Sequence, residues 1–162
     1  MGENNRAMNQ TNDKKFAKDA AMGGMAEVKK GQLAVEKASN PDVKAFGQKM
    51  VDDHTKVNEE LKEVASKESI DLPTSLDSKQ QGMVDKLSKL SGAAFDKAYM
   101  KDMVKDHDTD VKEFQRVAQN GTDTAIRDFA SKTLPTLQEH QTLARDVQAK
   151  LSGKSTSADR SK

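Results

Sequence analysis

The stretch MKDMVKDHDTDVKEF, residues 100–114, decides the fold class of this chain. Its apolar residues recur at intervals of three and four, and this spacing continues beyond both ends of the stretch. Positions spaced in this way share one face of an α-helix. The stretch therefore predicts a long amphipathic helix with one buried row of residues: Met100, Met103, Val104, His107, Val111, Phe114 and Ala118.

A histidine interrupts this apolar row, and the same kind of interruption occurs in three other helical stretches. Their apolar rows contain Glu27, His54 and His140, each near the middle of its row. The chain has three histidines in all, and each directly follows an acidic residue: Asp53, Asp106 or Glu139. A buried ionisable side chain is costly unless it is paired or bound to a metal. Glu27, His54, His107 and His140 therefore require a common explanation.

Helix signals along the chain predict four long helices and one short helix. The long helices are expected at residues 13–38, 41–67, 93–119 and 124–151, and the short one at residues 77–90. Proline suits the first turn of a helix and Asn-Gly its end. Inside the last helix, Pro135 is expected to cause a bend or remove a hydrogen bond. We expect residues 1–11 to be flexible, residues 12–151 to form one domain, and residues 152–162 to be disordered.

The connection between the second and third long helices is long, and it determines how the helices are arranged. If it returns the chain along the bundle, Glu27 and the three histidines lie within about 5 Å of one level. A short, local connection would move His140 away from that level. Because no strand pattern is visible, we predict an all-α, ferritin-like four-helix bundle in up-down-down-up order, with the short helix in the long crossover.

Composition excludes several classes of function. Charged residues make up 33% of the chain, but the net charge is only +1 and the two signs are interspersed. We therefore expect no nucleic-acid partner, since no basic patch is visible. The absence of cysteine excludes disulfides and thiolate metal sites. No apolar run approaches the roughly 18 residues of a membrane span, and residues 1–5 carry no apolar signal core.

One carboxylate and three imidazoles suit a divalent transition metal such as Zn, Cu or Fe. Metal affinity would then fall as the pH drops through the usual histidine range near 6.5. The alternative is a metal-free polar layer in which Glu27 pairs with protonated histidines. Met50 and Met103 lie one turn before a histidine, where they supply copper-like thioether ligands or simply fill the core. The carboxylates of Asp53, Asp106 and Glu139 either support a histidine on the next helix or face solvent.

Several blocks of sequence carry a family resemblance. They are Met25-Ala26-Glu27-Val28, Val51-Asp52-Asp53-His54, Leu72-Pro73, Gly92-Ala93-Ala94-Phe95-Asp96, and Leu134-Pro135-Thr136-Leu137-Gln138-Glu139-His140. Over about residues 14–148 the chain resembles the bacterial domain-of-unknown-function family 4142. The resemblance implies a ferritin-like bundle and a periplasmic or outer-membrane location, because members usually carry a signal peptide or lipoprotein signal. It implies no established activity.

A ferritin-like di-iron site does not fit the sequence. Such sites use Glu-x-x-His on paired helices, whereas Val51 and Leu137 precede His54 and His140 by three residues. We therefore expect an extracytoplasmic bundle with a mononuclear metal site that serves metal binding or stress-related buffering. Two alternatives remain, a metal-free structural or interaction protein of the envelope and a small metal-dependent redox enzyme. Metal identity, protein partners and oligomeric state are left open.

Overall fold

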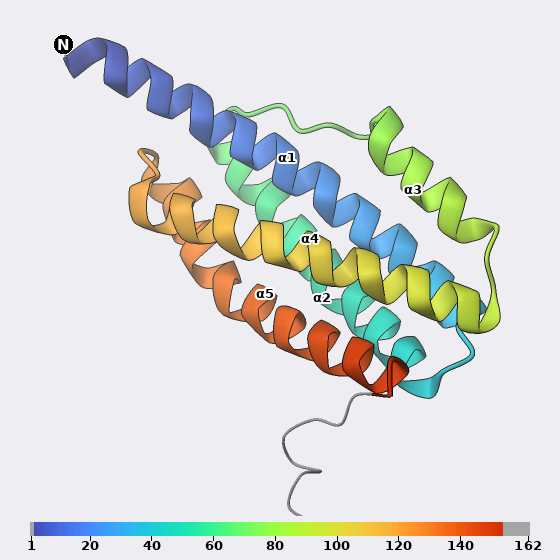
Figure 1. The fold of residues 1–162 in the computed structure, drawn as a ribbon. Coiled ribbons are helices and arrows are strands. Elements are labelled where there is room, and N and C mark those ends of the chain that lie inside the picture. Colours follow the sequence, from blue (N-terminus) through green and yellow to red (C-terminus); the bar gives the residue numbers. More distant parts are fainter. Residues whose placement is uncertain (1, 154–162) are drawn as a thin grey trace, which may run out of the picture.

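The protein is all-helical in a computed structural model that describes residues 2–153. Four long helices lie side by side as a bundle, and a short helix packs on its outside (Figure 1). In chain order the five helices are α1 Gly2–Lys37, α2 Pro41–Lys67, α3 Ser78–Ser88, α4 Gly92–Asn120 and α5 Thr124–Leu151. None of them is long and apolar enough to cross a membrane.

The predicted boundaries of the second, fourth and fifth helices agree with α2, α4 and α5 to within a residue. The prediction for α1 is wrong, because this helix begins at Gly2 and not near residue 13. Residues 3–12 contain neither proline nor glycine, so nothing in them stops the helix, and Figure 1 shows it extending past the bundle. Among the residues whose burial is described, the first buried ones are Asp13 and Phe16. The predicted disordered tail lies, from residue 154 onward, outside the described residues.

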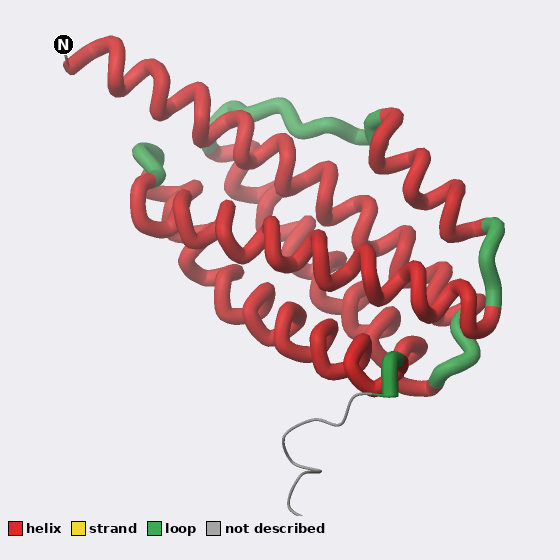
Figure 2. The backbone as a smooth tube through the Cα atoms, viewed as in Figure 1, coloured by secondary structure: helices red, strands yellow, loops and turns green. Residues whose placement is uncertain are grey.

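Two aspartates fix the directions of the helices. Asp96, at the start of α4, accepts hydrogen bonds from the backbone N–H groups of Ser39 (3.1 Å) and Asn40 (3.0 Å) in the α1–α2 turn. At the opposite end, Asp13 of α1 accepts from two backbone N–H groups of the α4–α5 turn, at 2.9 and 2.7 Å. Both α2 and α4 therefore start at the end of the bundle that holds the α1–α2 turn. The segment between them, including α3, carries the chain back along the bundle (Figure 2).

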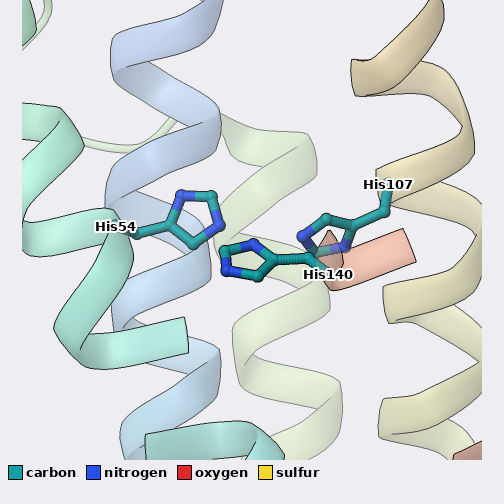
Figure 3. Close-up of side chains that lie close together, drawn as sticks. All are labelled: His54, His107 and His140. Carbon is teal, nitrogen blue, oxygen red and sulfur yellow. The ribbon is translucent and has the colours of Figure 1, made fainter. Parts of the chain in front are cut away.

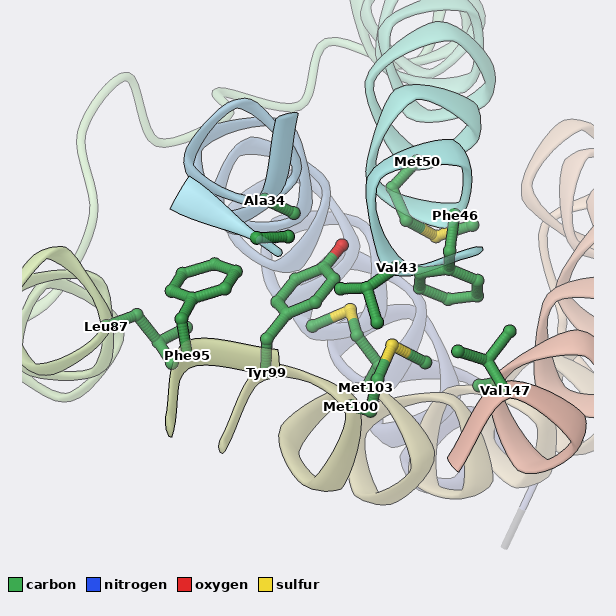
Figure 4. Packing of buried hydrophobic residues seen from close by; sticks show 12 residues of the cluster. Ala34, Val43, Phe46, Met50, Leu87, Phe95, Tyr99, Met100, Met103 and Val147 are labelled. Carbon is green, nitrogen blue, oxygen red and sulfur yellow. The ribbon is translucent and has the colours of Figure 1, made fainter. Parts of the chain in front are cut away.

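Two apolar clusters fill the bundle, one toward each end. The cluster nearer the α1–α2 turn, shown in Figure 4, includes Met50 of α2, Met103 of α4 and Ala144 of α5. The cluster nearer the α4–α5 turn includes residues further along α2 and α4 and earlier in α5: Leu61, Val111 and Leu137. On each of these helices the histidine falls between the two clusters in sequence. The bundle therefore places its three histidines at one level, with apolar packing above and below.

Helices α1 and α2 approach each other closely at two glycines. A Cβ atom built on Gly31 would lie 2.7 Å from the carbonyl oxygen of Gly47, and one built on Gly47 would lie 2.5 Å from the Cβ of Ala34. Real Cβ contacts are not this short, so only glycine permits this backbone approach. At Gly24 the neighbour is instead the side chain of Asn58, and at Gly23 there is nothing within 4 Å.

Candidate metal site

The three histidines meet in the core from three different helices. His54 comes from α2, His107 from α4 and His140 from α5, and Figure 3 shows the rings grouped in the space between these helices. One ring nitrogen from each residue lies within 4.8 Å of those of the other two. The ring centroids are 5.3 to 5.9 Å apart. The convergence predicted for the histidines from helix periodicity is therefore present.

A backbone carbonyl fixes the tautomer of His107. Its Nδ1 lies 2.9 Å from the carbonyl oxygen of Met103, one turn earlier on α4. A carbonyl oxygen only accepts hydrogen bonds, so Nδ1 carries the proton and donates. The other nitrogen, Nε2, then carries a lone pair, and this buried atom has no hydrogen-bond partner.

A carboxylate on another helix has the same effect on His140. Nε2 of His140 lies 2.7 Å from Oδ2 of Asp53 on α2, so Nε2 donates and Nδ1 carries the lone pair. That Nδ1 is also buried and without a partner, as is Nε2 of His54. Each of the three histidines thus has one buried nitrogen with no hydrogen-bond partner. Buried polar atoms without partners are rare in proteins, so these nitrogen lone pairs are candidates for binding an ion that is not part of the chain.

Burial keeps the three imidazoles neutral. His107 and His140 have no exposed surface and His54 is 4% exposed. Burial lowers the pKa of His107 to about 4, although the Met103 carbonyl opposes the change. It also lowers the pKa of His54 well below 6.5, and the two neighbouring histidines lower it further. The pKa of His140 is lowered less far because Asp53 opposes the effect of burial. All three rings are therefore in the form that binds metals at neutral pH.

The arrangement fits a small transition-metal ion after a modest contraction. A tetrahedral ion with metal–nitrogen distances of about 2.0–2.1 Å holds its nitrogen ligands about 3.4 Å apart. The ring nitrogens, within 4.8 Å of one another, would have to close by at most about 1.4 Å. The Asp53–His140 pair also matches the carboxylate–histidine–metal arrangement that orients ligating histidines.

Glu27 does not join the histidines in this group. It is 2% exposed and lies 3.7 Å from the ammonium group of Lys30, one turn further along α1. Lys30 is 1% exposed and donates to Asp102 and Asp106 of α4, each at 2.7 Å. Burial raises the pKa of Glu27 well above its usual value, and Lys30 only partly opposes this. The carboxyl group of Glu27 thus belongs to a buried charge cluster between α1 and α4.

The other predicted supporting residues differ in what they contact. Asp53 contacts a histidine of a neighbouring helix, as the pattern allowed. The carboxylate of Asp106 instead accepts from Lys30, and that of Glu139 lies 3.2 Å from Lys49. The side chains of Met50 and Met103 belong to the apolar cluster near the α1–α2 turn, and Met103 reaches His107 through its backbone carbonyl.

A cavity of about 310 Å³ adjoins the histidine cluster on the side of the α4–α5 turn. His54 forms part of its wall, together with Asn58, Thr133 and Gly23. Asn58 Oδ1 and Thr133 Oγ1 are buried and have no hydrogen-bond partner. The cavity therefore has a mainly apolar wall that contains these two unpartnered oxygens, and it reaches the most exposed of the three histidines.

The sequence pattern did not identify two lysines that pair with acidic residues near the cluster, the buried Lys30 and the partly exposed Lys49. Lys30 lies three residues after Glu27, a spacing that places opposite charges side by side on a helix. Lys49 lies 3.2 Å from both Asp53 and Glu139, and so links α2 to α5. The i, i+3 and i, i+4 pairs within one helix are visible in the sequence. The pairs between helices depend on helix rotation, which the sequence pattern does not give.

Comparisons with known proteins agree with the fold. A crystal structure of a "putative secreted protein DUF305" from Streptomyces coelicolor superposes with a TM-score of 0.71 at 16% sequence identity. The superposition covers 90% of this chain and 95% of the other. No curated protein matches the sequence. The sequence model of one protein family, described as a domain of unknown function (DUF4142), matches residues 1–147. The chain, an all-helical bundle with a histidine cluster at its centre, therefore belongs to the DUF4142 family.

Proposed function

We propose that this protein binds one divalent transition-metal ion through His54, His107 and His140. Two observations carry the proposal: the three histidines each bring one ring nitrogen within 4.8 Å of those of the other two, and each has one buried ring nitrogen without a hydrogen-bond partner. Leaving a buried polar atom unpaired costs about 1–3 kcal/mol. Three such atoms at one point are more economically explained by an ion than by three independent defects.

The donor set narrows the kind of ion. Three neutral imidazoles suit Zn, Cu or Fe and disfavour Mg and Ca, which prefer oxygen ligands. Bound there, such an ion would act as a Lewis acid with a coordination position left for a fourth ligand. We do not assign Glu27 as that ligand, because Lys30 holds its carboxyl group in the α1–α4 charge cluster.

The role that we propose is metal binding or buffering in an extracytoplasmic compartment. Two things support it, the enclosed site and the location that the family resemblance implies. The up-down-down-up order of the helices also supports a ferritin-like description of the bundle. The missing Glu-x-x-His pattern on α2 and α5 argues against a dinuclear iron centre.

A metal-free structural role is the second candidate, and one observation favours it. The cluster of Lys30 with Asp102 and Asp106 is a buried polar network that is satisfied without any ion. If the histidines likewise need no ion, the polar residues at this level of the bundle only fix how the helices pack. The two candidates differ in whether purified protein takes up a metal.

Titration of untagged, metal-free protein with Zn(II) against a chromophoric chelator tests the proposal. We expect one Zn(II) per chain, and a rise in the melting temperature because the ion binds only the folded state. His107→Ala should abolish both effects. If the wild-type protein binds no zinc, or His107→Ala binds it as well as the wild type, the metal-free role is the correct one.

Asp53 and Asp52 provide a matched pair of variants that leaves the ligands in place. Asp53→Asn removes the carboxylate that orients His140, so we expect zinc affinity to fall by about 10–100-fold. Asp52→Asn changes the neighbouring residue, which is exposed and bonds Gln48, and should bind zinc like the wild type. Equal loss in both variants would show a non-specific effect of charge.

A further inference from the structure

An ion that reaches the histidine cluster must cross the wall of the bundle. His107 and His140 are 0% exposed, whereas His54 is 4% exposed. Of the three histidines, His54 therefore has the most exposed surface. The question of how an ion enters rests on the proposed function, since it assumes that the cluster binds one.

Other side chains occupy three sides of the cluster. Between α1 and α4 lies the buried ammonium group of Lys30, paired with Asp102 and Asp106. Between α2 and α5, Lys49 lies 3.2 Å from the carboxylates of both Asp53 and Glu139. Toward the α1–α2 turn the neighbours are apolar, with Met50 and Met103 on the helices that carry His54 and His107.

The fourth side is the cavity at His54. Of the three carboxyl groups in its wall, that of Asp19 is paired with Lys15 and that of Glu113 with Arg116, whereas Asp110 makes no ion pair among the described residues. Burial raises the pKa of Asp110 to about 7, so above that pH its charge draws cations toward the cavity.

Two oxygen atoms without hydrogen-bond partners border the same cavity as His54. Thr133 is 3% exposed and its Oγ1 has no partner, and Asn58, one turn after His54 on α2, has an unpartnered Oδ1. Both residues line the cavity. Oxygen atoms of this kind can accept hydrogen bonds from the water molecules of a hydrated ion.

We propose that this cavity is the entry site through which a hydrated divalent cation reaches the three histidines. Gly23 keeps it open: it lies in the wall, and a Cβ atom built on it meets nothing within 4 Å. A larger side chain at this position would extend into the cavity without touching a histidine. The structure therefore offers a way to block entry and leave the ligands unchanged.

The test is the rate of Zn(II) binding and release by Gly23→Leu, measured by stopped-flow with a fluorescent chelator. The substitution should slow both rates by about tenfold or more, the effect of a barrier raised by about 1.4 kcal/mol, with little change in affinity. Gly82→Leu is the matched control. It too adds a side chain to a helical glycine with nothing within 4 Å of its Cβ, but Gly82 is on α3, away from the cavity, and its rates should equal those of the wild type.

A second variant tests the charge of the wall. Asp110→Asn, measured above the pKa of Asp110, should slow association several-fold and weaken its dependence on ionic strength. Wild-type rates in Gly23→Leu would overturn the entry site while leaving the metal site intact. So would a loss of affinity with no change in the association rate. If the wild-type protein itself binds no zinc, the proposed function fails, and the entry site fails with it.

Discussion

At the residue scale, the histidine cluster depends on how each ring is held. The backbone carbonyl of Met103 accepts a hydrogen bond from His107, and the carboxylate of Asp53 accepts one from His140. In each ring the other nitrogen then carries a lone pair. Burial then lowers the histidine pKa values, to about 4 for His107. The sequence-based expectation that protons compete with a metal near pH 6.5 therefore needs correction. Competition at His107 should begin at a lower pH.

The lowered pKa of His107 predicts how the metal-free protein responds to acid. An unfolded histidine titrates near 6.5, so between about pH 6.5 and 4 the unfolded chain binds the additional proton. The contribution of His107 to the free energy of unfolding is fully present above that pH range. It is lost as the pH falls through the range, by about 3 kcal/mol for a pKa shift of this size. Urea denaturation at several pH values, with a chelator present, measures the loss.

The control for this prediction is a variant without the buried titrating group. In His107→Leu the free energy of unfolding should depend less on pH across the same window. If the variant shows the same pH dependence as the wild type, His107 does not gain a proton when the protein unfolds. That result would contradict the lowered pKa of His107 in the folded protein.

Sequence reasoning found the histidines but not all of their surroundings. Periodicity places a residue on a helix face, which was enough for His54, His107 and His140. It does not give the rotation of one helix against another. For that reason Glu27 was grouped with the histidines, although its carboxyl group lies beside Lys30. The rotation of the helices also decides whether Asp53 faces solvent or a histidine on the next helix, so both alternatives were left open until the structure showed its contact with His140.

At the element scale, helix ends with clear signals were predictable. Asn40-Pro41 begins α2, with the side chain of Asn40 accepting from two backbone N–H groups, and Asp123 caps α5 in the same way through one. The start of α1 carried no such signal, and its prediction was wrong. Helix α5 continues through Pro135, and His140 one turn later still reaches the cluster. Packing of the whole helix overrides one weak position.

The close approach of α1 and α2 predicts a large effect of one methyl group. In Gly47→Ala the new Cβ would lie 2.5 Å from that of Ala34, so the two helices must move apart. We expect a loss of about 1–3 kcal/mol in the free energy of unfolding. The better helix propensity of alanine, about 1 kcal/mol, offsets only part of the packing cost. Urea denaturation measures the change.

Gly82→Ala serves as the control for this prediction as well. Its Cβ would meet nothing within 4 Å, so only the propensity gain remains, and stability should rise by about 0.5–1 kcal/mol. If both alanine variants gain stability, the close contact of α1 with α2 does not limit the packing of the bundle.

At the scale of the whole molecule, the bundle isolates one polar level between two apolar clusters. The crossover order was predicted from the levels of Glu27 and the three histidines, and of these four only the histidines come together. Asp96 and Asp13 join the turns to the long helices at the two ends of the bundle. The cavity beside His54 could not be predicted, because it depends on how side chains from four helices pack against one another.

Anomalous diffraction from crystals of the untagged protein soaked in Zn(II) tests the metal site most directly. We expect one strong peak inside the bundle, about 2.0–2.1 Å from His54 Nε2, His107 Nε2 and His140 Nδ1. We also expect Asp53 to keep its contact with His140 in the zinc-bound structure. Zinc bound only at surface carboxylates, with the three ring nitrogens still as far apart as in the metal-free fold, would contradict the proposed metal site.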